Sequence, residues 1–372
     1  MSKYKPVIVV VAYNRAHSLK RLLGSLELAS YNTKDIRLII SIDKGVDNQD
    51  VVKVAESFCW KYGEKEVRYQ DNNLGLRNHV LKCGDLTQEY GSIIMLEDDL
   101  YVAPDFYNYT LQALEFTKND FSVGGISLYK HEINMCTYKA FNPIEDGYDN
   151  WYFQYAASWG QAWSAIHWKS FKEWYDKGQN LKGNLSIPRY VRSWSEKSWL
   201  KYNIAYLIEK NKYFLYPKIA LSTNFSDVGT HVGNTSTAYQ VPLFMMKSKT
   251  YKFSTVEESL SVYDAFYENA KLYMYLNKGK EDLVVDLYGH KEYYGNKYLL
   301  TDKIMNYKIL NSFSRLLKPI EMNVVNNIKG EELFLYDVNF KEINSRSFNN
   351  LNSVFIVLNT FLLKILLKFI NI

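Results

Sequence analysis

The stretch "SIIMLEDDLYVAPDFY" (92–107) decides the fold, because it sets three adjacent acidic residues directly after an apolar run. The run "SIIML" predicts a buried β-strand. Glu97, Asp98 and Asp99, called the acidic triplet below, carry like charges that repel one another. Something has to compensate these charges. The stretch therefore predicts a strand that ends at a charged site.

The segments before this stretch alternate between strand and helix patterns. The predicted strands cover residues 6–13, 36–43, 66–71 and 92–96. The predicted helices cover residues 17–29, 50–63 and 76–90. This βαβαβαβ order predicts a parallel sheet with right-handed crossovers and with helices on both faces.

Polar residues follow three of the predicted strands, namely Asn14, Asp43 and the acidic triplet. Parallel sheets bind ligands beyond the carboxyl ends of their strands, so we expect these residues to meet in one crevice. Mg²⁺ and Mn²⁺ prefer carboxylate oxygens and bind through one or two carboxylates plus substrate phosphates. The triplet thus predicts a divalent cation and a phosphorylated ligand. The alternative is a solvated acidic turn that begins a helix.

Three segments of the chain carry a family resemblance. They are "PVIVVVAYNRAHSLKRLLGSL" (6–26), "LIISIDKG" (38–45) and "IIMLEDDLYVAPDFYNY" (93–109). Together they resemble the nucleotide-sugar-binding half of GT-A-fold glycosyltransferases, of the N-acetylglucosaminyltransferase I type and of bacterial family-2-like transferases. The resemblance covers residues 5–115, is patchy over 150–233, and implies an α/β GT-A fold with a mostly parallel sheet flanked by helices. It also implies a metal-dependent, inverting sugar transfer from a nucleoside-diphosphate donor, with UDP favoured.

The resemblance implies roles for the residues at the first two strand ends. Tyr13, Asn14 and Arg15 flank the nucleotide, and Asp43 accepts a hydrogen bond from the nucleobase, with uracil expected. An Arg near a diphosphate is a charge-assisted donor, which agrees with this assignment. The alternatives are a turn cap for Asp43 and a surface position at the start of a helix for Arg15.

Within the acidic triplet, the resemblance implies that Glu97 and Asp98 lie near the ribose and the donor sugar and that Asp99 binds Mn²⁺ or Mg²⁺. The segment "NNLGLRNHV" (72–80) matches a loop that borders the nucleotide in this family. Arg77 and His79 are therefore second-tier candidates for the nucleotide site. A histidine on a helix surface is the alternative for His79.

The segment "STNFSDVGTHVGN" (222–234) resembles a loop that closes over the nucleotide diphosphate in this family. Its glycines allow the chain to fold over a ligand. His231 is a candidate metal ligand there, because an imidazole nitrogen binds divalent metals. A surface histidine is the alternative interpretation.

The catalytic base of this family is an acid in a tryptophan-containing helix of the acceptor half. The matching segment is "YVRSWSEKSWLKYNIAYLIEK" (190–210), where Ser198 stands beside Trp199 and Glu196 lies two residues earlier. We therefore expect Glu196 to deprotonate the acceptor hydroxyl, the step that inverting transfer requires. Asp176 and Asp227 are alternatives for this role. A plain first-turn helix acid is the alternative interpretation of Glu196.

The segment "AASWGQAW" (156–163) resembles the loop that cradles the donor and acceptor sugars in this family. Trp159 is a candidate for stacking on a sugar face, and Gly160 allows a close approach of the backbone. Trp163 and Trp168 are expected in the hydrophobic core instead.

Composition limits the classes of partner. The 372 residues are 47% hydrophobic and 16% aromatic, with a net charge of +5 in which Lys and Arg are dispersed among acids. A dedicated nucleic-acid surface is not expected. We expect the nucleotide-sugar-binding half over 1–125, the acceptor half over 126–240, and a helical extension of unknown role over 241–350. Within the extension, residues 251–283 have an amphipathic helical pattern.

The last segment, "LNSVFIVLNTFLLKILLKFINI" (351–372), is apolar nearly all round a helix, and its only charges are two lysines. It predicts an interfacial membrane anchor, or alternatively a final helix packed on the core. The three cysteines are widely spaced and no signal peptide precedes the first strand, so we expect a cytoplasmic protein, peripheral at the inner face of the membrane. A lipid-linked saccharide of a bacterial surface polysaccharide is then the expected acceptor.

Two other function classes remain open. A sugar-1-phosphate nucleotidyltransferase also uses acids and a divalent metal on an α/β sheet. It needs a glycine-rich, basic triphosphate loop near the first strand, and "VAYNRAHS" (11–18) is not one. A non-catalytic module that binds glycans or nucleotides is the second class, because Ser198 stands where the family has an acid.

Overall fold

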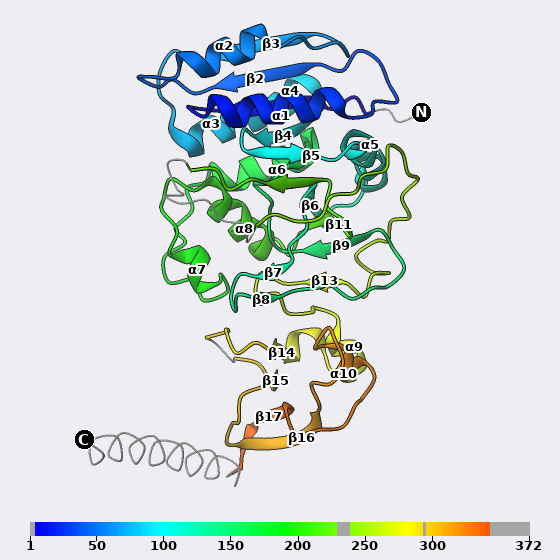
Figure 1. Cartoon of the computed structure of the whole chain (residues 1–372). Helices are drawn as coiled ribbons and strands as arrows, with labels where there is room; N and C mark the ends of the chain where they lie inside the picture. Colours follow the sequence, from blue (N-terminus) through cyan, green and yellow to red (C-terminus); the bar gives the residue numbers. More distant parts are fainter. Residues whose placement is uncertain (1–3, 229–238, 293–294, 343–372) are drawn as a thin grey trace, which may run out of the picture. The chain divides into compact units, whose positions relative to one another are not determined.

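The computed structural model describes residues 4–228, 239–292 and 295–342 (Figure 1). The chain divides into two compact units, the first ending at Tyr267 and the second beginning at Glu268. The boundary expected at residue 240 falls inside the first unit. Residues just beyond it belong to this unit because Leu243 bridges to Ala220. Each unit is described by itself below.

Within the described residues, nine strands of the first unit form one sheet in the order β13-β9-β11-β6-β10-β4-β1-β2-β3. They are β1 (Val7–Ala12), β2 (Leu38–Ile42), β3 (Lys65–Tyr69), β4 (Ser92–Glu97), β6 (Val123–Ser127), β9 (Asn150–Phe153), β10 (Gln161–Ser164), β11 (Tyr213–Pro217) and β13 (Val262–Tyr263). The strands β3, β2, β1 and β4 are parallel, as the alternating patterns predicted. Strand β10 is antiparallel to both β4 and β6, so the sheet is mixed beyond β4.

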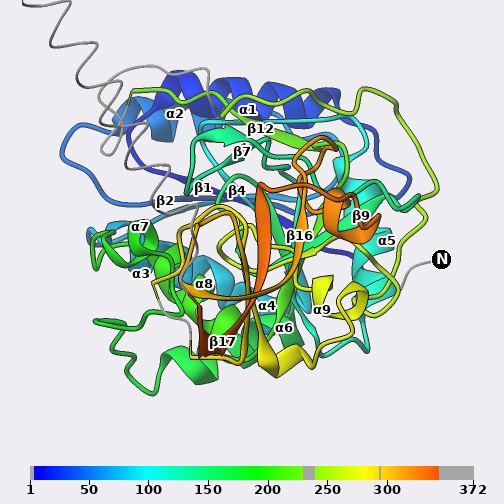
Figure 2. The same cartoon turned by 90° about the horizontal axis from the view of Figure 1, so that it is seen from below.

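Helices cover both faces of this sheet. They are α1 (Ala16–Leu28), α2 (Gln49–Ser57), α3 (Gly75–Gly84), α4 (Leu86–Tyr90), α5 (Phe106–Thr117), α6 (Ala165–Tyr175), α7 (Arg189–Arg192) and α8 (Trp199–Glu209). Figure 2 shows α1 and α2 on one side of the central strands and α3, α4, α6 and α8 on the other. Helix α1 buries Leu19, Leu22, Leu23 and Leu26, a spacing that forms one apolar stripe facing the core. The predicted α/β architecture, with a mostly parallel sheet flanked by helices, is confirmed.

Two short strands outside this sheet bring a distant segment to the acidic triplet. Strand β5 (Leu100–Val102) follows the triplet and pairs antiparallel with β12 (Ser222–Asn224). The backbone N–H of Phe225 also donates to the carbonyl of Asp99 over 3.0 Å. Residues after β12 therefore lie beside the triplet, although more than a hundred positions separate them in sequence. A small hairpin of β7 (Ile133–Asn134) and β8 (Lys139–Ala140) lies in the same unit.

The helix predicted over 251–283 is wrong. This segment forms only β13, the single-turn α9 (Leu272–Tyr275) and a short 3₁₀ turn (Lys280–Asp282). Before β13 it runs along the sheet edge, where the N–H of Tyr152 donates to the carbonyl of Ser261 over 2.8 Å. Tyr251 and Phe253 pack edge-to-face against a tyrosine of α5. Aromatic packing against α5 thus overrides the helical pattern.

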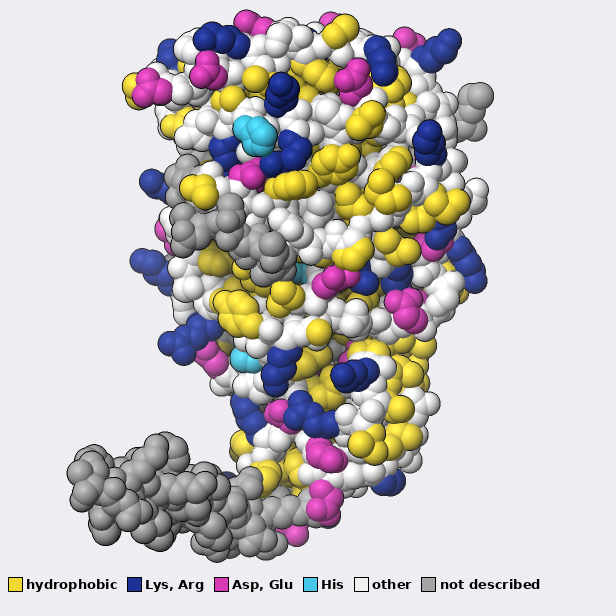
Figure 3. Space-filling view, viewed as in Figure 1, with side chains coloured by type: hydrophobic (Ala, Val, Ile, Leu, Met, Phe, Trp, Pro, Cys, Tyr) yellow, Lys and Arg dark blue, Asp and Glu magenta, His cyan; other side chains and the backbone are white. Residues whose placement is uncertain are grey.

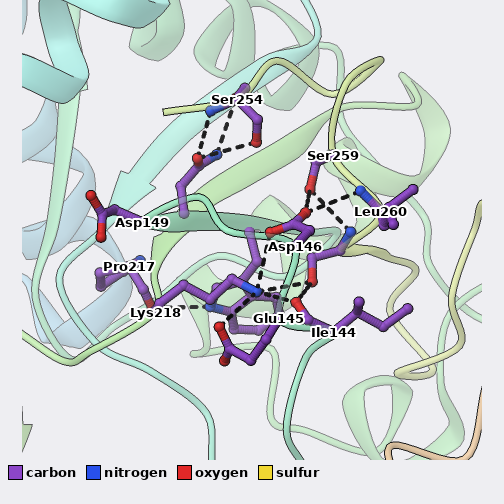
Figure 4. Close-up of polar contacts among 12 residues, drawn as sticks. Ile144, Glu145, Asp146, Asp149, Pro217, Lys218, Ser254, Ser259 and Leu260 are labelled. Carbon is purple, nitrogen blue, oxygen red and sulfur yellow. Dashed lines mark hydrogen bonds and ion pairs between the residues drawn. The ribbon is translucent and has the colours of Figure 1, made fainter. Parts of the chain in front are cut away.

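A buried lysine joins this edge segment to the sheet (Figure 4). Lys218 follows β11 and is 7% exposed. Its ammonium donates to the carbonyl of Ile144 and, over 3.2 Å, to the hydroxyl of Ser261, and it lies 3.5 Å from Asp146. Burial lowers the pKa of Lys218, although Asp146 and Glu145 oppose that effect. One cation therefore holds three chain segments together.

The second unit is a β-structure rather than the expected helical extension. Within its described residues four strands form a sheet in the order β14-β15-β17-β16. They are β14 (Leu283–Asp286), β15 (Tyr298–Thr301), β16 (Tyr307–Phe313) and β17 (Leu333–Lys341), and one further helix is α10 (Met322–Val325). The segment "YKILNSF" alternates partly buried with exposed residues at its start, which suits a strand. Leu300, Leu333 and Leu335 belong to its core.

The surface carries mixed charge on the face shown in Figure 3. Lys and Arg side chains are interspersed with Asp and Glu there rather than gathered in one basic area. Among the described helices, none is long and apolar enough to cross a membrane. The predicted anchor over 351–372 lies outside the described residues.

Candidate functional site

A cavity of about 550 Å³ lies at the carboxyl ends of β1, β2 and β4, where the sequence predicted a crevice. Nine of the predicted site residues line it. They are Tyr13, Asn14, Arg15, Asp43, His79, Glu97, Asp98, Asp99 and Trp159. Arg77, Gly160 and Glu196 do not line it, and His231 lies outside the described residues.

Arg15 supplies the positive charge that the acidic triplet requires. Strands β1 and β4 are parallel with Val11 opposite Glu97, so the residues that follow each strand lie next to one another. The Arg15 guanidinium donates to Asp99 Oδ2 over 2.8 Å and also pairs with Asp98 Oδ1. Burial disfavours the charged guanidinium, but Asp98 and Asp99 together raise the pKa of Arg15.

Arg15 nevertheless does not compensate the triplet completely. Burial raises the pKa of Glu97 to about 8, and the neighbouring Asp99 adds to the rise. Burial also raises the pKa of Asp98 to about 6, against the opposing effect of Arg15. Near pH 7 the Glu97 carboxyl is therefore mostly protonated, and the single Arg15 guanidinium faces two aspartates, so the site favours a further cation.

Asp99 fits the role of a metal ligand. It is 7% exposed, and within the described residues its Oδ1 atom is buried without a hydrogen-bond partner. No group of three or more His, Cys, Asp and Glu side chains arranged to hold a metal ion occurs among those residues. A cation at Asp99 would therefore take further ligands from phosphate oxygens and water, which is the usual arrangement for Mg²⁺.

Asp43 fixes the start of α3 at the cavity. It follows β2, is 4% exposed, and accepts backbone N–H groups of Leu74 at 2.8 Å and Lys44 at 3.0 Å through Oδ1. Its Oδ2 atom accepts the N–H of Gly75 at 2.9 Å. A carboxylate offers about four acceptor positions, so one position on Oδ2 remains for a ligand. The predicted contact with a nucleobase stays a prediction.

His79 lies in the core at the cavity wall rather than on a helix surface. It is 2% exposed, and its Nε2 atom lies 2.7 Å from the Ser41 hydroxyl. That hydroxyl accepts a further hydrogen bond from Gln70 over 3.1 Å. Burial lowers the pKa of His79 to about 4, so the imidazole is neutral near pH 7.

Arg77 positions a loop rather than the nucleotide in this structure. Its guanidinium donates to the carbonyl of Glu196 over 2.6 Å and lies 5.5 Å from the ring centre of Tyr202. Helix α3 is thereby joined to the loop before α8.

The three predicted candidates for the base differ in their relation to the cavity. The Glu196 carboxylate accepts from Lys201 over 2.8 Å and from Tyr202, and the Lys201 hydrogen bond is the main reason that the pKa of Glu196 is lowered. Asp176 pairs with Lys172 at the end of α6. Of these three described residues only Asp227 lines the cavity.

Asp227 is itself held in place at the cavity wall. It accepts from the Ser18 hydroxyl over 2.6 Å and from the guanidinium of Arg21. Burial raises the pKa of Asp227, but the hydrogen bonds from Arg21 and Ser18 outweigh burial and lower it overall.

Trp159 lines the cavity, whereas Gly160 serves the packing beneath it. The ring centre of Trp159 lies 4.7 Å from the ring centre of Tyr129 and 5.0 Å from that of Tyr239. Gly160 has φ +95°, and a Cβ atom there would lie 2.6 Å from the Ser222 hydroxyl, so only glycine fits beside β12.

The two tryptophans that were assigned to the core are buried there. Trp163 and Trp168 are fully shielded from solvent and pack with their ring centres 4.8 Å apart. This prediction is confirmed.

Sequence reasoning missed four polar residues of the cavity wall, namely Asn73, Lys197, Asn224 and Ser226. Asn224 and Ser226 reach the cavity because β12 pairs with β5, and a three-residue strand has too little pattern to predict. Lys197 is adjacent to the predicted Glu196, so the sequence analysis found the segment but not this lysine.

Comparisons with known proteins describe the first part of the chain. Residues 7–167 match the model of a family described as Glycosyl transferase family 2. No curated protein sequence matches the chain.

Solved structures give distant likenesses. S. aureus TarS 1–349 in complex with UDP-GlcNAc has 12% identity and a TM-score of 0.40, covering 61% of this chain and 60% of that one. The mannosyltransferase PcManGT from Pyrobaculum calidifontis, in complex with GDP-Man and Mn²⁺, has 13% identity and a TM-score of 0.32, covering 46% and 47%. A cytidylyltransferase from Leptospira borgpetersenii has 12% identity and a TM-score of 0.30, covering 53% and 74%. The chain thus spans less than two thirds of the TarS chain.

The family match covers the elements that build the cavity floor. It runs from the first residue of β1 into α6 and includes Arg15, Asp43 and the acidic triplet. The finer likeness to the N-acetylglucosaminyltransferase I type stays a prediction. Residues 7–167 of this chain match the glycosyl transferase family 2 model, which confirms the predicted resemblance to bacterial family-2-like glycosyltransferases over that part of the chain.

Proposed function

We propose that this protein transfers a sugar from a nucleoside-diphosphate donor, UDP-linked, to a saccharide acceptor, with Mn²⁺ or Mg²⁺ bound at Asp99. The observation that carries the proposal is the buried Asp99 oxygen without a partner among the described residues, in a cavity that also holds Arg15 and Asp43. A metal ligand, a cation for phosphate and an acceptor for a nucleobase are the groups that a nucleotide-sugar donor requires.

Asp43 binds the nucleobase in this proposal. Its remaining acceptor position on Oδ2 takes the imide N–H of uracil, which is a donor, whereas cytosine has no such N–H in its neutral form. Tyr13 and Asn14 line the cavity beside it and flank the nucleotide. The neutral His79 adds no charge to this side of the cavity at pH 7.

Arg15 and Asp99 act on the diphosphate. When bound, the cation stabilises the negative charge that develops on the leaving group. Arg15 donates charge-assisted hydrogen bonds to the same phosphates once the donor draws its guanidinium away from Asp99. Trp159 offers a ring face for the sugar beside them.

Transfer with inversion requires a carboxylate that accepts the proton of the acceptor hydroxyl. The cavity position of Asp227 supports it in this role. Glu196 can act as the base only if its carboxylate breaks its hydrogen bonds with Lys201 and Tyr202. The rate of slow UDP-sugar hydrolysis, measured in Asp227→Asn and in Glu196→Gln, separates the two candidates. The variant that lacks the base should be slower by about 100-fold. Wild-type rates of hydrolysis in both variants would show that neither residue is the base.

Calorimetry with UDP tests the metal site. We expect UDP to bind at least ten-fold more tightly with Mn²⁺ than without it, and Asp99→Asn to abolish that difference because the amide replaces one carboxylate oxygen. Asp176→Asn is the control, since Asp176 lies away from the cavity. UDP binding that depends on neither Mn²⁺ nor Asp99 would contradict the mechanism. Release of pyrophosphate from UTP and a sugar phosphate would indicate a nucleotidyltransferase instead.

The acceptor is proposed to be a lipid-linked saccharide at the inner face of a bacterial membrane. Support comes from the composition of residues 351–372, which combine an apolar helix pattern with two lysines. Deleting these residues should release the protein from membranes in a flotation assay. Equal membrane binding after the deletion would remove the support.

A further inference from the structure

Lys197 lines the cavity from a different part of the chain than the strand ends do. It belongs to the loop before α8, whereas Arg15 and the acidic triplet follow β1 and β4. The family match ends before this loop, so nothing in the match assigns Lys197 a role.

Two cations fix the loop that carries Lys197. The Arg77 guanidinium, from α3, donates to the carbonyl of Glu196 over 2.6 Å. The Lys201 ammonium, from α8, is 5% exposed and donates to the carbonyl of Trp194 over 3.1 Å. The backbone on the amino-terminal side of Lys197 is therefore held by two helices.

The acid nearest to Lys197 in sequence is engaged elsewhere. The Glu196 carboxylate accepts hydrogen bonds from Lys201 and Tyr202. In the parts of the chain that the structure describes, no acidic side chain forms an ion pair with the Lys197 ammonium. Lys197 thus brings an uncompensated positive charge to the cavity.

Four carboxylates of the cavity wall have other partners. Asp98 and Asp99 pair with Arg15, Asp43 accepts three backbone N–H groups, and Asp227 pairs with Arg21. These contacts hold the four carboxylates in place, and none of the contacts involves Lys197. A ligand that enters the cavity therefore meets two cations, Arg15 and Lys197, of which only Arg15 is already paired.

We propose that Lys197 binds a phosphate oxyanion of the substrate on the side of the cavity formed by the loop before α8. The inference rests on the proposed function, which brings phosphate into this cavity. An ammonium group is a compact charge with three donors, a common partner of phosphate oxygens. The phosphate belongs either to the leaving diphosphate of the donor or to the acceptor.

Calorimetry on the full-length protein tests the donor as the source. UDP and UMP are titrated with Mg²⁺ into the wild type, Lys197→Gln and Lys197→Arg. If Lys197 binds the donor diphosphate, Lys197→Gln weakens UDP binding by about ten-fold and UMP binding much less, while Lys197→Arg retains most of the affinity. Lys182→Gln is the matched control, because Lys182 is an exposed lysine near Glu196 that does not line the cavity.

A second arm tests the acceptor as the source. Glycerol 3-phosphate is added to the preformed complex with UDP and Mg²⁺, and its binding is followed by phosphorus NMR. If Lys197 binds an acceptor phosphate, UDP affinity is equal in all variants and binding of glycerol 3-phosphate is lost in Lys197→Gln alone.

Equal binding of UDP and of glycerol 3-phosphate by the wild type and Lys197→Gln would overturn the inference while leaving the proposed function intact. Absence of UDP binding by the folded wild type would instead overturn the proposed function. The two failures are therefore distinguishable.

Discussion

Arg15 illustrates at the scale of the residue what sequence can predict. Its position after the first strand, at the same sheet edge as the acidic triplet, follows from the pattern of apolar runs. Its pairing with Asp98 and Asp99 depends on the register that sets Val11 opposite Glu97, which no local pattern contains. Charge compensation of the triplet was expected from a bound cation, whereas the protein already supplies part of it.

In the proposed function, a metal ion at Asp99 would lie beside the Arg15 guanidinium, which already occupies Oδ2. We expect Arg15→Gln to bind Mn²⁺ about ten-fold more tightly without nucleotide, because a positive charge beside the site is removed. UDP affinity should fall in the same variant, because a donor to the diphosphate is lost. Electron paramagnetic resonance of free Mn²⁺ measures the first effect and calorimetry the second.

The control for this prediction is Arg21→Gln, which removes a guanidinium that pairs with Asp227 rather than with the triplet. Mn²⁺ affinity should stay within two-fold of the wild type there. Unchanged Mn²⁺ binding by Arg15→Gln would show that the guanidinium does not oppose the metal.

At the scale of the element, prediction succeeded where local pattern and tertiary environment agree. Strands β1, β2 and β4 are mostly apolar because both faces of the sheet are covered, so their runs stand out in the sequence. Residues 251–283 have helical spacing, yet their aromatic side chains gain more from packing on α5. Strand β12 is too short to carry a pattern of its own, and only the family resemblance placed the segment that contains it at the site.

Helix α3 packs so closely on α6 that one methyl group should disrupt it. A Cβ atom at Gly84 would overlap the ring of Trp168, which is fully buried. We expect Gly84→Ala to lower the free energy of unfolding by about 1–3 kcal/mol, as overpacking does. Urea unfolding measures this change.

Gly24 in α1 is the matched control, since a Cβ atom there meets nothing within 4 Å. Gly24→Ala should raise the free energy of unfolding by about 0.5–1 kcal/mol, because alanine loses less conformational entropy in a helix. Equal effects of the two substitutions would contradict the proposed contact with Trp168.

At the scale of the whole molecule, composition and strand order predicted an α/β unit but not its extent. The mixed half of the sheet, from β10 to β13, depends on pairings between strands far apart in sequence. The second unit was misassigned as helical because the single turn α9 lies in an amphipathic stretch, and the strands of that unit were overlooked. Burial also depends on the whole fold, and in the first unit it keeps three histidines uncharged near pH 7.

Buried histidines make the first unit sensitive to acid. Burial lowers the pKa of His131 to about 3 and those of His79 and His167 to about 4. In the unfolded chain each titrates near its ordinary value of about 6.5. The unfolded state therefore binds more protons as the pH falls below that value, and these groups make the folded state less stable.

His131→Gln isolates one of these contributions. Between pH 7 and pH 5, the wild type should lose about 2 kcal/mol more of unfolding free energy than the variant, because glutamine does not titrate. Urea unfolding at both pH values measures the difference. His17→Gln is the control, as His17 is exposed on α1. An identical pH dependence of wild type and His131→Gln would contradict the expectation.

The position of β13 at the sheet edge has a consequence for synthesis on the ribosome. Its partner β9 lies about a hundred residues upstream, and the Lys218 contacts join the same distant segments. Strands β1 to β4 can pair as soon as they emerge, whereas the opposite edge stays open until β13 has left the exit tunnel. Such late, long-range pairing slows folding and leaves an unpaired edge exposed to other chains. Chaperone dependence should therefore concentrate in the interval between the emergence of β9 and that of β13.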